Sequence, residues 1–477
     1  MTYETVIGLE VHAQLSTITK LFSDASTRYG QHPNSQTTYL DAGYPGTLPV
    51  LNEKVLHMAI QFGLSINATI DEQCCFDRKN YFYPDLPKGY QITQHYRPII
   101  KDGYISIHLP EQKPKKVHIA YAHIEEDAGK SHHQIMPGLS GIDLNRAGVP
   151  LLEIVTSPCL HSAEEVVTYL KVLHEQLRFL NICDGNMQEG SFRCDVNLSL
   201  RKKGTLELGT RSELKNINSF RFIEKAIAVE ISRHHEHLET GIPIIQETRG
   251  YCPETNTTYS LRKKEDNTDY RYAPDPDLRP LLISKALITE IKSTMPISPS
   301  LIRQTLAEEH KLPESDLSFL MSSRSTCGYY FDVKKQTQAQ ISLIINWLKG
   351  PYSAVLNQSH KTFDNPPLSS KDLAYLLDKI QDNKLSMTRA KHLFLEALSK
   401  QQSIHELIQQ ESVSDQTTPP ADLHHLVQQL LADHPQQVAQ YRAGKEKLFG
   451  FFIGSLMKSL KGKADPNVLT QVLNEYL

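Results

Sequence analysis

Strict alternation of apolar and polar side chains in Ser191–Arg201 constrains the fold more than any other feature of the sequence. Its apolar positions are Phe192, Cys194, Val196, Leu198 and Leu200. Its polar positions are Ser191, Arg193, Asp195, Asn197, Ser199 and Arg201. Because a period of two belongs to a β-strand, we predict a strand with one face on a core and one polar face of mixed charge.

Two further segments predict strands that carry ionisable groups. In Thr5–Leu15 the apolar residues also alternate, which puts Glu10 and His12 side by side on the opposite face. Such a pair can ligate a divalent cation or orient a proton transfer, although a polar strand face can also simply meet solvent. The predicted strand His118–Asp127 ends in three adjacent acids that begin at Glu125. These acids repel one another unless a cation or basic group lies among them, and a solvated acidic turn is the alternative.

The segment Arg211–Asn216 offers another polar face of the same character. Several strands with carboxylates, Arg, Lys and His on one side suit a phosphate-handling centre, where carboxylates bind Mg²⁺ and basic groups contact phosphoryl oxygens. The sequence has no GxSxG or GxGxxG motif, and Lys130–Ser131 cannot end a P-loop because Ile124 stands where the first glycine is required. No cysteine lies in a recognisable nucleophile motif, so we expect any hydrolysis of an amide donor to occur on another chain.

The composition predicts a globular protein of a reducing compartment. Apolar residues make up 39% of the chain, enough for a buried core. The longest strongly apolar stretch, Leu448–Met457, is about half of the roughly 18 residues that a membrane span needs. Seven cysteines without a CxxC pair predict free thiols. No basic and apolar leader pattern follows Met1, so we expect no signal peptide, a cytoplasmic location and no membrane partner.

A basic surplus lies near the C-terminus of a chain whose net charge is only −3. Between Tyr441 and Lys463, six basic residues against the single acid Glu446 give a local charge of +5. The six are Arg442, Lys445, Lys447, Lys458, Lys461 and Lys463. Because local patches must hold any nucleic acid on a chain of this net charge, we predict that these residues contact phosphates; a solvated helix face is the alternative.

The organisation changes along the chain. Up to about residue 290 the sequence is strand-rich, with helical patterns at Ser162–Asn181 and Ser219–Glu239. After Pro296 it predicts helices with Ser or Asp caps, and polar breaks at Ser359–Leu368 and Gln409–Pro420 predict loops. We therefore expect an α+β fold.

Eight stretches together resemble one known family. They are Tyr3–His12, Phe76–Asp85, Glu125–Ser131, Asp143–Val155, Glu189–Asp195, Glu213–Asn216, Asp269–Tyr272 and Gly444–Glu446. They occur in order from residue 3 to the tail, and in them the chain resembles the B subunits of bacterial aspartyl/glutamyl-tRNA amidotransferases, the GatB family. The resemblance covers essentially the whole chain.

The resemblance implies a fold, an activity and partners. The fold would be a β-rich cradle domain with an antiparallel sheet at residues 1–292, an all-helical domain at 293–408, and a small helical tail at 409–477 that binds the tRNA body. The activity would convert Glu-tRNA(Gln), Asp-tRNA(Asn) or both to Gln-tRNA(Gln) and Asn-tRNA(Asn), with ATP phosphorylating the side-chain carboxylate and Mg²⁺ as a cofactor. The partners in a heterotrimer would be the A subunit, an amidase that delivers ammonia, and the small C subunit.

The strand patterns and the resemblance together give residue roles. The expected catalytic residues are Lys79, Glu125, Glu189, Arg193, Asp195, Glu213 and Lys215. The expected Mg²⁺ ligands are Glu10, His12 and Glu125. We expect Lys79 and Arg193 to contact phosphate oxygens. The expected substrate contacts are Tyr81, Asn216, Arg271 and Tyr272.

The sequence departs from the family pattern at two places. Some members have a CxC…CxxC zinc knuckle near the N-terminus. Its four positions are occupied here by Ser23, Ala25, Thr38 and Asp41. We therefore expect no zinc. Ala273 and Asp275 replace the usual Phe and Glu of the stretch after Asp269, which would reshape the pocket for the ester end while its charges are kept.

Two other functions fit the same residues. The chain could be a non-catalytic RNA-binding or scaffold subunit, or a stand-alone metal-dependent phosphotransferase or hydrolase. ATP turnover that depends on misacylated tRNA would support transamidation, and tRNA binding without turnover would support the scaffold. Turnover without any partner would support the third function.

Overall fold

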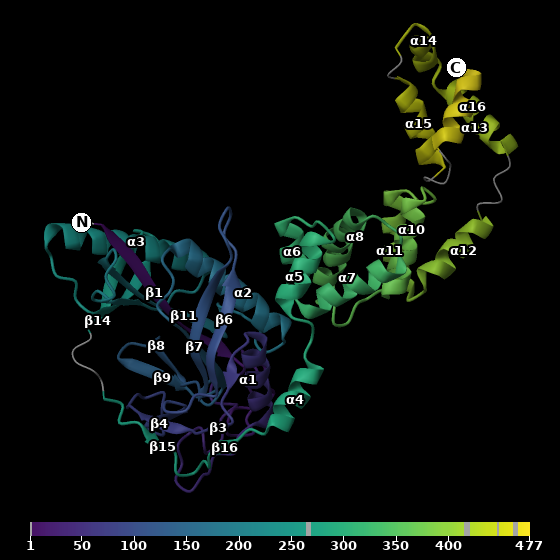
Figure 1. The fold of residues 1–477 in the computed structure, drawn as a ribbon. Coiled ribbons are helices and arrows are strands. Elements are labelled where there is room, and N and C mark those ends of the chain that lie inside the picture. The colour runs from purple at the N-terminus through teal and green to yellow at the C-terminus, as the bar shows by residue number, and fades with distance from the viewer. Residues whose placement is uncertain (1, 264–268, 415–419, 446–447, 461–465) are drawn as a thin grey trace. The chain divides into compact units, whose positions relative to one another are not determined.

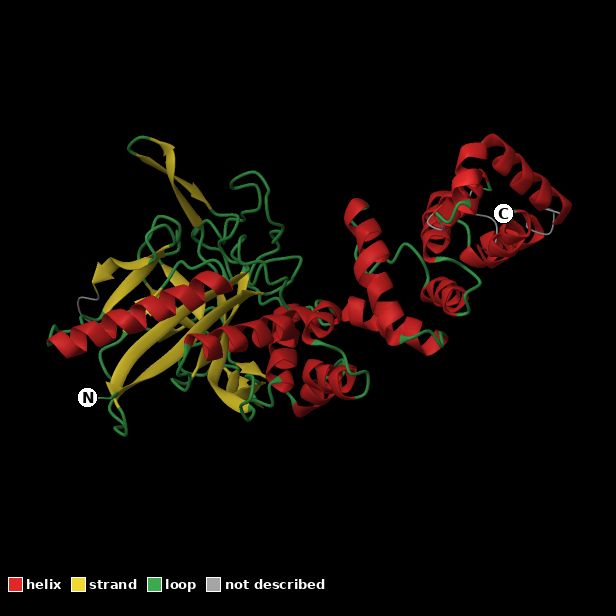
Figure 2. Cartoon of the chain, turned by 90° about the horizontal axis from the view of Figure 1, so that it is seen from above, coloured by secondary structure: helices red, strands yellow, loops and turns green. Residues whose placement is uncertain are grey.

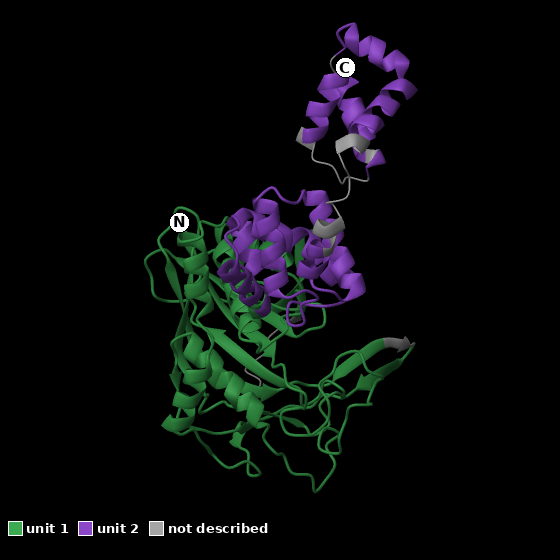
Figure 3. Cartoon of the chain, turned by 90° about the vertical axis from the view of Figure 1, so that its right-hand side faces the viewer, with its two compact units in different colours: residues 1–313, 321–324 green, residues 314–320, 325–477 purple. Residues whose placement is uncertain are grey.

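The computed structural model describes residues 2–263, 269–414, 420–445, 448–460 and 466–477. The chain forms two compact units (Figure 3). The first comprises Met1–Pro313 with Met321–Arg324, and the second Glu314–Leu320 with Ser325–Leu477. In the described residues the strands belong to the first unit and the second unit is helical (Figures 1 and 2). The predicted α+β fold is confirmed.

A nine-stranded sheet forms the centre of the first unit. Its strands, in spatial order, are β14 (Thr257–Lys263), β13 (Glu247–Cys252), β12 (Ser212–Leu214), β11 (Phe192–Lys202), β1 (Tyr3–Gln14), β10 (Pro150–Thr156), β7 (Lys115–Glu126), β6 (Ile100–Ile107) and β2 (Thr69–Ile70). Neighbouring strands are antiparallel except β12 and β13, which are parallel. The smaller sheets join β15 (Ala273–Pro274), β4 (Asp77–Asn80) and β5 (Tyr90–Thr93), β16 (Leu281–Leu282) and β3 (Gln73–Cys74), and β8 (Lys130–Met136) and β9 (Leu139–Asp143).

One face of the large sheet packs on helices α1 (Glu53–Ser65), α2 (Ala163–Phe179) and α3 (Phe220–Thr240) (Figure 2). The alternation predicted for the first strand accounts for this packing. The five apolar side chains of alternate positions from Ile7 to Leu15 are at most 2% exposed and belong to the core. Glu10 and His12 therefore lie on the opposite face of the sheet.

Helix α1 is an element that the sequence analysis misses in the strand-rich half. Its buried residues Val55, Met58 and Phe62 have helical spacing, and the Asn52 side chain accepts a hydrogen bond from the N–H of Lys54 as an N-cap. The helical signal was therefore present. Helices α2 and α3 lie where they were predicted.

Helices continue from the end of the first unit through the second. They are α4 (Lys285–Thr294), α5 (Pro299–Glu308), α6 (Glu314–Leu320), α7 (Arg324–Gln336), α8 (Ile341–Trp347), the π-helix η1 (Leu348–Tyr352), α9 (Ser353–Gln358), α10 (Ser370–Gln381), α11 (Met387–Lys400), α12 (Ile404–Ser414), α13 (Pro420–Asp433), α14 (Pro435–Arg442), α15 (Leu448–Ser459) and α16 (Pro466–Tyr476). The last four share a small core around Val427, Phe452 and Leu473. Among the described residues, no helix is both long and apolar enough to span a membrane.

The predicted loops and domain limits agree only in part with these helices. The loop predicted at Ser359–Leu368 separates α9 from α10, whose N-cap is Ser369. The loop predicted at Gln409–Pro420 is wrong at both ends, because residues 409–414 continue α12 and Pro420 begins α13, while residues 415–419 lie outside the described residues. The expected domain limits after residues 292 and 408 fall inside α4 and α12, and the three-domain division stays a prediction.

Candidate active site

The register of the central strands brings polar residues of different strands together. His12 on β1 lies opposite Arg193 on β11 and, on its other side, opposite Glu153 on β10. Glu10 lies opposite Asp195 on β11. Because directly opposed residues have Cβ atoms about 4.5–5.5 Å apart, the charged ends of these side chains meet on one face of the sheet.

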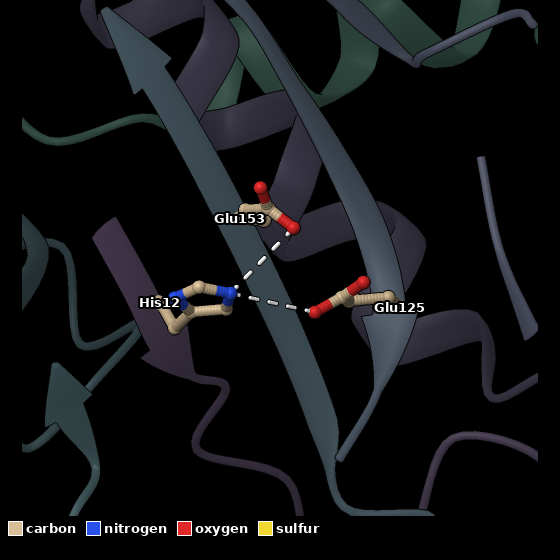
Figure 4. Close-up of side chains that lie close together, drawn as sticks. All are labelled: His12, Glu125 and Glu153. Carbon is tan, nitrogen blue, oxygen red and sulfur yellow. Dashed lines mark ion pairs between the residues drawn. The ribbon is translucent and has the colours of Figure 1, made fainter. Parts of the chain in front are cut away.

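The first group of side chains is centred on His12 (Figure 4). Its Nε2 lies 3.5 Å from Glu153 Oε2 and 3.7 Å from Glu125 Oε1. His123 Nε2 approaches the same two residues, at 3.2 Å from Glu153 Oε2 and 3.5 Å from Glu125 Oε2. One ligand atom each of His12, Glu125 and Glu153 lies within 4.8 Å of the others, a spacing that could hold a metal ion.

The charges of this first group shift the pKa values of its members. Burial alone would lower the pKa of His123, but Glu153 and Glu125 outweigh burial and raise it to about 10. Glu153 likewise raises the pKa of His12 against burial. Burial would raise the pKa of Glu153, but the two imidazoles hold it well below its ordinary value. In the metal-free protein, the shifted pKa values favour an imidazolium at His123 beside a carboxylate at Glu153.

Glu10, Asp195 and Glu213 form a second group, from β1, β11 and β12, with one oxygen of each within 4.8 Å of the others. Lys215 Nζ lies 2.5 Å from Asp195 Oδ2 and 3.2 Å from Glu213 Oε1. Burial raises the pKa of Glu10, and the neighbouring Glu153 and Asp195 raise it further. The three carboxylate oxygens are close enough together to hold a metal ion.

Lys79 on β4 adds a positive charge close to the first group. Burial would lower the pKa of Lys79, but nearby charges, with Glu125 the largest among them, raise it. Its ammonium nitrogen lies 4.9 Å from the ring centre of Tyr270 and 5.9 Å from that of Tyr81. This face of the sheet therefore carries two clusters of acidic side chains with cations held beside them, the combination that a phosphoryl-transfer site requires.

Comparison with known families assigns the chain. A model described as the GatB/GatE catalytic domain matches residues 5–289. The chain belongs to the GatB family. A second model, described as a GatB domain, matches residues 329–477, and the resemblance seen in the sequence motifs is confirmed.

Members of the GatB family with curated names match the chain over its full length. It is 54% identical over 477 residues to the B subunit of the aspartyl/glutamyl-tRNA(Asn/Gln) amidotransferase of Legionella pneumophila (strain Lens), with all of both chains covered. The B subunits of the same name from Nitrosococcus oceani and Francisella tularensis subsp. novicida are 48% and 47% identical, again over all of both chains.

In this GatB-family site, Arg193 is bonded to the last of the three adjacent acids. Its Nη2 lies 3.0 Å from Asp127 Oδ2, which also accepts a hydrogen bond from Gln14 Nε2 at 3.0 Å. Its buried Nε has no hydrogen-bond partner within the described structure. Asp127 thus holds the Arg193 guanidinium in place, and the Nε–H of this guanidinium remains available as a hydrogen-bond donor.

Four other predicted residues lie at the surface or beside the first group, where burial and the charges of Lys79, Glu125 and Glu153 influence the pKa of Tyr272. Glu189 is exposed in the turn before β11, and Asn216 is exposed after β12 with a φ of +62°. Arg271 is also exposed, and its carbonyl accepts a hydrogen bond from Asn80 Nδ2. Tyr272 stacks on His95 with ring centres 3.7 Å apart. These residues border the site or lie at the surface.

The tail residues of the GatB-family domain are only partly described. Arg442 donates to the backbone carbonyls of Tyr476 and Leu477 at 3.3 and 3.2 Å, and Lys445 is exposed. Lys458 belongs to α15. Lys447, Lys461 and Lys463 lie outside the described residues. Their role in tRNA binding stays a prediction.

Two residues of the first group escaped the sequence analysis. Glu153 is the only charged residue of β10, and His123 shares a strand face with Glu125, two residues away. A lone acid in an apolar strand is a signal that could have identified Glu153. At the departure Asp275, the buried carboxylate accepts a hydrogen bond from Arg78 Nε at 2.9 Å, and Arg78 precedes Lys79 on β4. The reshaping of the ester-end pocket stays a prediction.

Proposed function

We propose that this chain is the ATP-dependent transamidation subunit of a tRNA amidotransferase. It would phosphorylate the side-chain carboxylate of Glu-tRNA(Gln), Asp-tRNA(Asn) or both, and amidate it with ammonia from a partner amidase. Membership of the GatB family supports tRNA-dependent amidotransfer within a multi-subunit enzyme. The observation that supports this chemistry best is the presence of two carboxylate groups on one sheet face beside Lys79, Lys215 and Arg193.

The reaction needs activation because ammonia cannot displace an oxide from a carboxylate. Transfer of the γ-phosphoryl group of ATP to a carboxylate oxygen releases ADP and gives an acyl phosphate. The ammonia nitrogen then attacks the carbonyl carbon, the bond from this carbon to the phosphate oxygen breaks, and phosphate leaves as the nitrogen loses a proton. Negative charge builds up on the phosphoryl oxygens during the first step, so fixed cations are needed there.

The chain's own residues fit Mg²⁺ as the cofactor of this step. The all-carboxylate group of Glu10, Asp195 and Glu213 offers the oxygen ligands that Mg²⁺ prefers. The group of His12, Glu125 and Glu153 includes a nitrogen, which also suits transition metals. A bound Mg²⁺ would neutralise charge on the phosphates of ATP.

The cations would act on the phosphate oxygens. Lys79 and Arg193 are our choices for these contacts, and the Nε of Arg193, which has no hydrogen-bond partner among the described residues, is available as a donor. Lys215 now neutralises Asp195 and Glu213. Lys215 would thus lie beside a metal ion held by these two carboxylates. The A subunit, an amidase, would supply the ammonia and the small C subunit would complete the heterotrimer, in the cytoplasm, where charged tRNA is found.

The function is tested by comparing the isolated chain with the assembled enzyme. The assembled enzyme is expected to release ADP only when misacylated tRNA is present, with correctly aminoacylated tRNA as the control. The isolated chain is expected to make no amide from glutamine, because it has no recognisable amidase nucleophile. Amide formation from glutamine by the pure isolated chain, or equal ATP turnover without tRNA, would refute the proposal. Tight tRNA binding without any turnover would support the scaffold function instead.

The tail is expected to bind the tRNA body and to take no part in the chemistry. Truncation after Ser414, which keeps α12 whole, should raise KM for the aminoacyl-tRNA about tenfold and change kcat about twofold or less, because lost uniform binding appears in KM. The dependence of KM on salt should also weaken, because fewer phosphates are neutralised. If KM and its salt dependence are both unchanged, the tail does not bind tRNA.

A further inference from the structure

Lys20 is a fully buried cation, with 0% of its surface exposed, that lies outside the two clusters of acidic side chains described above. Its Nζ lies 3.1 Å from Asp41 Oδ2 and donates to the carbonyl of Leu144 at 3.2 Å. Asp41 also accepts hydrogen bonds from Ser23 Oγ at 3.2 Å and from the N–H of Thr38 at 2.9 Å. A buried charge is costly unless it is paired and hydrogen-bonded, so this arrangement depends on all of its members.

The Lys20–Asp41 pair joins parts of a long segment that lies between β1 and α1. The N–H of Lys20 donates to the carbonyl of Ala25, and the carbonyl of Lys20 accepts from Asn52 Nδ2, the N-cap residue of α1. Asp41 lies 21 residues further along the chain than Lys20. The pair therefore closes this segment on itself, as a structural cross-link does.

The turn Leu144–Val149 lies directly against this pair. The N–H of Leu21 donates to the carbonyl of Gly148 at 2.9 Å. Gly148 has a φ of +80°, and a Cβ added to it would lie 2.7 Å from Asp41 Oδ1. With the bond from Lys20 Nζ to the carbonyl of Leu144, both ends of the turn are held by the pair and its neighbour.

The same turn holds the residue that binds Arg193. The N–H of Gly148 donates to the carbonyl of Asp127 at 2.9 Å, and the N–H of Asp127 donates to the carbonyl of Val149 at 2.8 Å. Arg146 of the turn donates to the carbonyl of Ala128 at 2.9 Å. Asp127 then meets Arg193 at 3.0 Å. Contacts thus run without a break from Lys20 to a cation of the active site.

We propose that Lys20 and Asp41 are positioning residues for phosphoryl transfer. The pair positions the Leu144–Val149 turn, and this turn positions Asp127, which holds the Arg193 guanidinium. Neither member touches the reacting atoms. This inference rests on the proposed function, in which Arg193 contacts phosphoryl oxygens.

A double-mutant cycle between Lys20 and Asp127 in the assembled, full-length enzyme tests the proposal. Lys20→Met is expected to lower kcat for tRNA-dependent ATP turnover about tenfold with KM for tRNA changed about twofold or less. In an Asp127→Asn background the same change should cost about twofold or less, because residues of one network are not additive. An equal loss of kcat in both backgrounds would overturn the proposal.

Two further variants separate positioning from stability. In the double variant Lys20→Met, Asp41→Leu, apolar side chains replace both residues, and this variant should melt near the wild-type temperature. Its kcat should still be low, because the hydrogen-bond donor to the carbonyl of Leu144 is lost. Recovery of both melting temperature and kcat would mean that the pair only stabilises the fold. If that variant does not fold, Gly148→Ala can be used instead, because its added Cβ would push the turn away from Asp41. Its loss of kcat must then also be smaller in the Asp127→Asn background.

The control is Lys115→Met, which breaks an ion pair of Nζ–Oε2 distance 2.7 Å to Glu165 of α2 in the same unit. It is expected to keep the wild-type kcat. Glu10→Gln, measured in the same assay, separates the two levels of inference. If Glu10→Gln and His12→Ala, measured together, both have normal turnover, the proposed site itself is wrong. If Glu10→Gln is inactive while Lys20 and Asp127 act independently, only the positioning role is wrong.

Discussion

Replacement of Glu10 by glutamine is expected to lower tRNA-dependent ATP turnover about 10²-fold or more, the scale of losing one electrostatic contact at a transition state. The amide has the same size, and Asn197 Nδ2, which donates to Glu10 Oε1 at 2.8 Å, can still bond to the amide oxygen. The change therefore removes charge from the group of Glu10, Asp195 and Glu213 with little change of shape. Turnover should be measured at saturating tRNA over a range of Mg²⁺ concentrations, since a lost ligand raises the Mg²⁺ requirement.

Glu4→Gln is the matched control for this prediction. Glu4 lies on the same face of β1, six residues from Glu10, and its Oε1 is 2.5 Å from Arg201 Nε. Its loss should change turnover about twofold or less, as expected for a partly exposed ion pair. Near-normal turnover in Glu10→Gln and His12→Ala alike would contradict the metal-ligand assignment.

The strands and their faces could be predicted because the signal for them is local. In β1 and β11 the period of two is complete, and burial of one face follows from it without knowledge of any partner strand. Glu10, His12 and Asp195, which lie in the two groups of the candidate site, were found in this way. The fold class followed from the same local periods.

The grouping of the site residues could not be predicted, because it depends on strand order and register. Glu10 and His12 are two residues apart on one strand, about 6.8 Å, whereas neighbouring strands are about 4.8 Å apart. Each residue is therefore grouped with cross-strand partners, and the predicted ligand set of Glu10, His12 and Glu125 is divided between two groups. Glu153 enters only because β10 lies between β1 and β7.

Replacement of Glu153 by glutamine is expected to cause a loss of turnover of about 10²-fold or more, as for Glu10. Glu153 lies between two imidazoles, with its Oε2 at 3.5 Å from His12 Nε2 and at 3.2 Å from His123 Nε2. An amide leaves both imidazoles without their nearest counter-charge. Glu165→Gln, which alters an ion-paired acid of α2, is the control and should keep normal turnover.

The same variant makes a second prediction for the metal-free protein, in the titration of His123. Among the groups that raise the pKa of His123 to about 10, Glu153 contributes most and Glu125 also contributes, so in Glu153→Gln this pKa should fall toward its ordinary value of about 6.5. A raised pKa stabilises the fold fully below about 6.5, and this stabilisation is lost as the pH rises through about 10. The difference in unfolding free energy between wild type and Glu153→Gln should therefore be largest at about pH 6 and shrink as the pH rises through neutrality toward 10. Nuclear magnetic resonance titration of His123 and denaturant unfolding at several pH values measure both effects, and an unchanged titration together with normal turnover would show that Glu153 has neither role.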